Sequence, residues 1–123
     1  MDEKSLKEAI QVYFNATNES DAEEMATVFH DSAHLYQIGD DGALSDWDKD
    51  FFMNIIATGK QDDQGKVFPT YNEILAIDFT SDNTAVARVK VRVRDLLFTD
   101  ILSFIRLDGR WWIIAKAAVG VPV

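Results

Sequence analysis

The chain has 123 residues, which suits one domain with a sizeable core, and 47% of them are hydrophobic, as in an ordinary globular protein. Its formal net charge of −9 argues against nucleic acid or an anionic membrane surface as a partner. The absence of cysteine excludes disulfides, thiol catalysis and zinc–thiolate sites.

Two amphipathic helices are predicted in the first thirty residues. The buried stripe of the first helix recurs at helical spacing between residues 3 and 17, and it consists of Leu6, Ile10, Tyr13, Phe14 and Thr17. Ser20 and Glu23 form a capping box, because each side chain can satisfy a free backbone N–H. This box predicts the start of a second helix, which continues to about Phe29.

A short strand and a third helix are predicted next. Residues 34–38 favour a strand, and a turn follows at residues 40–42. Ser45 is a suitable N-cap for the third helix, and Gly59 is its predicted C-cap. The predicted buried stripe of this helix consists of Trp47, Phe51, Phe52, Ile55 and Ile56. A polar loop over residues 60–70 follows.

The last part of the chain predicts four consecutive strands, at residues 71–79, 84–94, 96–107 and 110–119. In residues 84–94, alanines and valines alternate with Arg88, Lys90, Arg92 and Arg94, which is typical of a half-buried strand. We interpret the basic side chains as a polar sheet face that pairs with acids on a neighbouring strand or subunit. Helices followed by a run of antiparallel strands indicate an α+β fold in a single domain, residues 1–123.

The order and spacing of several short motifs resemble the nuclear-transport-factor-2-like superfamily, which has a cystatin-like fold, and within it the putative lumazine-binding family. The matching motifs are Tyr13-Phe14, Ser20-Asp21-Ala22, Val28-Phe29-His30, Asp41-Gly42, Phe98-Thr99-Asp100 and the closing run from Asp108 to Lys116. One departure is the stretch from His30 to Ala33, where the family more often carries a Pro-Asp pair. The resemblance implies a cone in which three N-terminal helices pack on a curved, mostly antiparallel sheet.

Two hypotheses about function stay open, because members of the superfamily include isomerases, dehydratases, polyketide cyclases and non-catalytic binding proteins. The first is a small-molecule-binding or accessory protein with an apolar pocket in a dimeric cone. The second is an enzyme in which Asp100 is the general base and Tyr13 or Tyr36 donates a hydrogen bond to an enolate oxygen. A carboxylate and a tyrosine in one cavity would favour the enzyme, whereas an entirely apolar cavity would favour binding.

A metal site is not expected. The run from His30 to His34 has the outline of a metalloprotease motif, with aspartate in place of glutamate. Its two histidines would have to share one helical face, but the helix is expected to end near Phe29, and the sequence holds no third histidine. We expect neither a metal nor another cofactor, and we interpret His30 as a residue near the helix C-terminus.

Six residues are predicted to bind a ligand at the mouth of the cone, namely Tyr13, Tyr36, Trp47, Phe51, Asp100 and Trp111. Helical spacing directs the first-helix tyrosine and the third-helix aromatics toward the sheet, and Trp111 with Ile113 would form the floor. The expected ligand is flat or aromatic, with Tyr36 and Asp100 as its polar contacts. The same aromatics could instead simply fill the cone.

The direction of Asp100 decides between two interpretations. Asp100 alternates with Leu102 and Phe104, so on an inward face it would be a buried acid that needs a partner. On an outward face it would pair with a basic residue of the neighbouring strand. We favour the outward pairing, because opposite charges across strands are common.

A homodimer is expected through the open face of the sheet. Trp112 and Ile114 point away from the face of Trp111 and would leave an apolar patch in a monomer. No nucleic acid or membrane partner is expected. The chain has no apolar run near the roughly 20 residues of a transmembrane helix and no signal-peptide pattern, so a cytoplasmic location is predicted.

Overall fold

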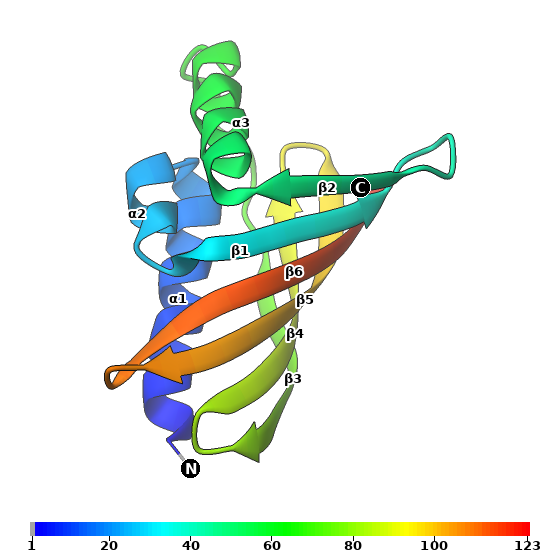
Figure 1. The fold of residues 1–123 in the computed structure, drawn as a ribbon. Helices are drawn as coiled ribbons and strands as arrows, with labels where there is room; N and C mark the ends of the chain where they lie inside the picture. The colour runs from blue at the N-terminus through cyan, green and yellow to red at the C-terminus, as the bar shows by residue number, and fades with distance from the viewer. Residues whose placement is uncertain (1) are drawn as a thin grey trace.

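Helices and strands follow one another in the computed structural model, which describes residues 2–123 (Figure 1). The helices are α1 (Glu3–Glu19), α2 (Ala22–Ala26) and α3 (Lys49–Asp62). The strands are β1 (Phe29–Ile38), β2 (Leu44–Asp48), β3 (Asn72–Ser81), β4 (Thr84–Val93), β5 (Leu96–Leu107) and β6 (Arg110–Pro122). These elements confirm the α+β fold and the four consecutive C-terminal strands.

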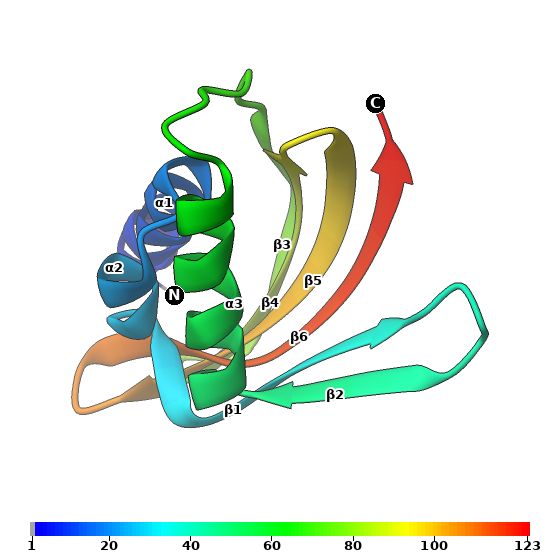
Figure 2. The ribbon, with the colours of Figure 1, turned by 90° about the horizontal axis from the view of Figure 1, so that it is seen from above.

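The strands form one curved sheet in the order β2-β1-β6-β5-β4-β3. The parallel pair is β1 with β6, and the other neighbours are antiparallel. Figure 2 shows that the sheet bends around α1 and α3, which lie on its concave side. This is the predicted cone, with the core between the helices and the concave face.

The core confirms the two periodicities on which the fold prediction depends. On β4 the inward positions Ala85, Ala87, Val89 and Val91 are buried, as the alternation predicts. On α1 four residues of the predicted stripe are buried, Leu6, Ile10, Tyr13 and Phe14, together with Ala16, while Thr17 of the predicted stripe is half-buried. Each pattern places a continuous apolar surface on one side of its element, so the helix packs against the strand.

The second helix is shorter than predicted and is capped by a different residue. Asp21 is its N-cap and accepts a hydrogen bond from the Glu24 N–H at 3.1 Å. Ser20 instead ends α1 in a left-handed conformation, with φ of 50°. The helix stops at Ala26, and Phe29 begins β1, whose pairing with β6 takes over the backbone hydrogen bonds. His30 therefore lies on a strand and not at a helix end.

The third helix begins later and ends later than predicted. Ser45 and Trp47 belong to β2, which pairs with β1, and Asp48 caps α3 by accepting from the Phe51 N–H at 2.9 Å. The helix continues past Gly59 to Asp62. Gly59 therefore lies inside the helix and not at its end, and it faces the side chain of Arg94.

Among residues 2–123, no helix is both long and apolar enough to cross a membrane. The cytoplasmic location stays a prediction.

Candidate functional site

A cavity of about 240 Å³ lies between the helices and the concave face of the sheet. Its walls are mostly apolar and include Leu35, Trp47, Phe52, Ile56, Val91 and Phe98. Polar side chains also line it, and three of them lie close together: Tyr13 from α1, Asp100 from β5 and Lys116 from β6. The other polar lining residues are Thr17, Ser20, Gln37 and Arg94. An apolar space with a few convergent polar groups is the usual form of a small-molecule site.

Tyr13, Asp100 and Lys116 form a buried cluster. The Tyr13 hydroxyl donates a hydrogen bond to Asp100 Oδ2. Lys116 Nζ lies 3.8 Å from the same oxygen, beyond hydrogen-bond distance, so the two groups pair only as charges. Tyr13 and Asp100 are fully buried, and Lys116 is 8% exposed. Within the described residues the second carboxylate oxygen, Asp100 Oδ1, has no hydrogen-bond partner.

Burial sets the proton affinities of this cluster. It raises the pKa of Tyr13 well above the ordinary value, and the charge of Asp100 adds to the effect, so the phenol remains a protonated donor. Burial lowers the pKa of Lys116, which Asp100 opposes. The ammonium also lies 4.8 Å from the Phe52 ring centroid and 5.2 Å from that of Tyr13, where the ring faces stabilise a cation.

A β-bulge in β6 turns Lys116 into the cavity. Ile113 pairs with Phe104 and Ala115 pairs with the adjacent Ser103, so Ile114 is an extra residue. Beyond it the inward and outward positions exchange, and Lys116 becomes buried. Strict alternation from Ile113 would place it outside, so sequence reasoning missed it. The available signal was a single lysine within a run that is otherwise apolar from Trp111 to Pro122.

The structure brings three of the six predicted ligand-binding residues together in the cavity lining: Tyr13, Trp47 and Asp100. The favoured outward pairing of Asp100 is wrong, because this carboxylate is 0% exposed and faces α1. Tyr36 lies outside the lining and stacks on His34, and Phe51 packs against Trp47 but is 48% exposed. Ligand binding by any of the six stays a prediction.

Trp111 lies away from the cavity, and its predicted place in the floor is incorrect. It is buried between Phe79 and Phe104, and its Nε1 donates to the Ser5 Oγ at 2.9 Å. Because the bulge reverses the inward positions of β6, the strand contributes Lys116 and Ala118 to the cavity lining instead.

The two histidines of the sequence lie on β1 with separate neighbours. The His34 Nδ1 is 2.6 Å from Asp46 Oδ1, while the His30 ring meets the Trp112 ring edge-on. In the described part of the chain, neither belongs to a group of side chains placed to hold a metal.

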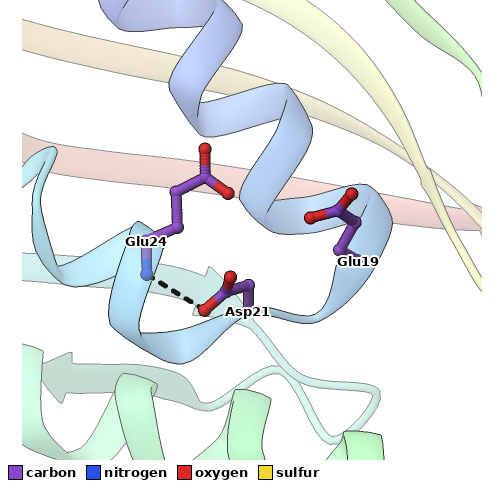
Figure 3. A group of neighbouring side chains, drawn as sticks. All are labelled: Glu19, Asp21 and Glu24. Atoms are coloured by element: carbon purple, nitrogen blue, oxygen red, sulfur yellow. Dashed lines mark hydrogen bonds between the residues drawn. The ribbon is translucent and has the colours of Figure 1, made fainter.

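One acidic group has its carboxylates within 4.8 Å of one another, and it consists of Glu19, Asp21 and Glu24 (Figure 3). Asp21 serves as the cap of α2 there. Helix capping thus explains the position of Asp21, and exposed acidic groups are common without an ion.

Solved structures share the fold over almost their full length. NTF2-like proteins of unknown function from Shewanella baltica OS155 and Methylobacillus flagellatus KT superpose with TM-scores of 0.83 and 0.78. Identity is 20% over 97% of this chain and 93% of the first, and 25% over 98% of this chain and 92% of the second. A ketosteroid isomerase-like protein from Erwinia carotovora atroseptica SCRI1043 superposes with a TM-score of 0.77. Its identity is 15% over 99% of this chain and 98% of that one.

No curated protein matches the chain. The sequence pattern of the family described as putative lumazine-binding matches residues 1–117. Together with the cone fold, this match shows that the chain belongs to the putative lumazine-binding family of the NTF2-like superfamily.

Proposed function

We propose that the cavity binds a small, flat ring system with a hydrogen-bond donor on its edge. The aromatic and aliphatic walls suit such a ring system, and Trp47 and Phe52 offer faces for stacking. The single observation that carries the proposal is the free oxygen Asp100 Oδ1.

A buried carboxylate oxygen without a partner is costly. Leaving such an acceptor unsatisfied costs about 1–3 kcal/mol or more for a charged group. Tyr13 satisfies Asp100 Oδ2 but not Asp100 Oδ1. A ligand N–H or O–H that reaches Asp100 Oδ1 would remove this cost, so the protein gains stability when it binds.

Lys116 adds a donor beside this acceptor. Its ammonium lies close to the carboxylate and borders the same cavity. An N–H next to a carbonyl, as in a cyclic amide or imide, would meet both groups at once. Lumazine, the pteridinedione in the family's name, has such an edge on a flat two-ring body. We therefore propose a lumazine-like heterocycle as the ligand class.

Calorimetric titration with lumazine tests the proposal. Asp100→Asn replaces the acceptor and should weaken binding at least about tenfold, which corresponds to about 1.4 kcal/mol. Lys116→Met should also weaken it, because it removes both the contact to the carbonyl and the positive charge that pairs with Asp100. Asp78→Asn, at an exposed position of β3, is the control and should leave the affinity unchanged. Equal affinities for wild type and a folded Asp100→Asn variant would contradict the proposal.

A second candidate function is proton abstraction next to a carbonyl, and the observation in its favour is a carboxylate and a tyrosine in one cavity. Asp100 Oδ1 would be the general base. The Tyr13 proton is engaged by Asp100, so Lys116 would stabilise the enolate oxygen in its place. The test is deuterium exchange into 2-tetralone in D2O, followed by proton NMR. A rate equal to that of buffer would exclude this activity for that ketone.

We also propose that the outer face of the sheet forms a homodimer. In support, Trp112 is half-buried and pairs across the strands with Ile105, and Ile101 on the same face is 47% exposed. A second copy would remove this apolar surface from water.

A further inference from the structure

We propose that Arg94 forms an anion-binding subsite at the mouth of the cavity, so that the ligand carries an acidic group on the side that faces solvent. This inference rests on the proposed function, which concerns the ring of the ligand, and it adds an acidic substituent to that ring. Arg94 borders the cavity and also a separate surface groove between the end of α1, residues 63–70 and the end of β4. It therefore stands where the interior meets the outside.

The guanidinium of Arg94 keeps donors free. Its Nε donates to Asp63 Oδ1 at 2.7 Å, and its Nη2 donates to Asp63 Oδ2 at 3.3 Å. A guanidinium has five N–H groups in one plane, so this pairing uses two of them. The side chain is 40% exposed. A carboxylate, sulfonate or phosphate can thus bind the remaining edge without breaking the ion pair.

A left-handed turn residue and a missing side chain place the guanidinium here. Arg94 has a φ of 54°, in the left-handed region that residues other than glycine seldom adopt. Gly59 lies beneath it on α3, and a Cβ at this position would be 2.3 Å from Arg94 Nη2. Because glycine has no side chain, the guanidinium can approach the backbone of α3 at this point.

The groove outside is basic within an acidic protein. Its lining contains four cationic side chains, namely Lys60, Lys66, Arg92 and Arg94, against the acids Glu19 and Asp63. The whole chain has a net charge of −9. A local excess of positive charge at the edge of a cavity attracts anions to it.

Two dyes with the same ring system test this inference. 8-Anilinonaphthalene-1-sulfonate carries a sulfonate, and N-phenyl-1-naphthylamine is its uncharged parent. Fluorescence titration of wild type should give tighter binding of the sulfonate. Arg94→Gln should lower the affinity for the sulfonate dye about tenfold, as expected for the loss of a charge-assisted hydrogen bond. It should leave the affinity for the neutral dye unchanged. Lys4→Gln, at an exposed position of α1 outside both the cavity and the groove, is the control and should change neither affinity.

Asp63→Asn separates ligand binding from a purely structural role. If Arg94 binds the anion, removal of the negative charge of Asp63 beside it should strengthen binding of the sulfonate dye, opposite to the effect of Arg94→Gln. If the Arg94–Asp63 ion pair only stabilises the position of α3, both substitutions should lower the affinities for both dyes to the same extent. That result would overturn the subsite. Equal affinities of the wild type for the two dyes would also overturn the anion subsite, but they would leave the proposed function intact. Failure of both dyes to bind would contradict the proposed function as well.

Discussion

The hydroxyl of Tyr13 donates a hydrogen bond to Asp100 Oδ2 and so joins α1 to β5 across 87 positions of the chain. Both side chains are fully buried. The bond uses the one proton of the phenol and one of the two carboxylate oxygens. Tyr13 therefore fixes the orientation of the carboxylate, while Asp100 Oδ1 has no hydrogen-bond partner among the described residues.

Tyr13→Phe should lower the free energy of unfolding by about 1–3 kcal/mol, because it leaves a buried carboxylate oxygen without its donor. Urea denaturation measures this loss. Tyr71→Phe is a matched control, since the Tyr71 hydroxyl donates to Glu73 Oε1 at 2.6 Å on the exposed surface. This substitution should lower the free energy of unfolding by less than about 0.5 kcal/mol. Equal losses in the two variants would refute the role of burial. Unchanged lumazine affinity alongside a lowered melting temperature would place Tyr13 in the core and outside the ligand site.

The stability lost in Tyr13→Phe should shrink in alkali. Burial raises the pKa of Tyr13 above 10.0, so near pH 10 the unfolded tyrosine loses its proton while the folded one keeps it. The folded state then binds more protons, and wild-type stability falls as the pH rises. Lys116 acts in the opposite direction, because its lowered folded pKa makes stability rise with pH below 10.5. Its contribution cancels between wild type and Tyr13→Phe.

Urea denaturation of these two proteins over a series of pH values is the measurement. The gap between their free energies of unfolding should be constant near neutrality and narrow above about pH 10, the ordinary pKa of tyrosine. A gap that stays constant through this range would show that Tyr13 titrates in the folded protein as it does in the unfolded chain.

Gly59→Ala should reveal the contact beneath Arg94. Alanine in place of a helical glycine ordinarily stabilises by up to about 1 kcal/mol. Here the new Cβ would push Arg94 Nη2 away from Asp63, so the substitution should stabilise the otherwise wild-type protein by less than this amount. In an Arg94→Ala background the ordinary gain should return. A double-mutant cycle by urea denaturation measures the difference, and the same effect in both backgrounds would argue against the contact.

Trp112→Glu should convert the proposed dimer to a monomer in analytical ultracentrifugation, because it would bury an unpaired charge in the interface at a cost of several kcal/mol. Val67→Glu, at a loop position that is 90% exposed, is the control and should leave the assembly unchanged. A wild-type protein that already sediments as a monomer would remove the basis for the interface.

The regular parts of the fold were predictable because their patterns are local. The alternation in β4 and the stripe of α1 each follow from spacing within one element. The strand β2 was not predictable in this way, because Ser45, Asp46 and Asp48 also suit a helix N-terminus. Its pairing with β1 depends on a partner elsewhere in the chain.

The candidate site was only partly predictable for the same reason. The alternation of Asp100 with Leu102 and Phe104 correctly puts all three on one face, but which face is buried depends on where the helices pack. Lys116 was hidden by the bulge at Ile114, since one extra residue exchanges the two faces of a strand. A bulge of this kind arises from pairing with the neighbouring strand and leaves no clear local signal.

A crystal structure of the protein with lumazine tests the central claim most directly, since it locates the ligand relative to Asp100. We predict that the ring lies in the cavity with an N–H about 2.7–3.2 Å from Asp100 Oδ1, the ordinary range of a hydrogen bond. Tyr13 should still donate to Asp100 Oδ2. A ligand bound outside the cavity, or inside it with Asp100 Oδ1 still without a partner, would contradict the account.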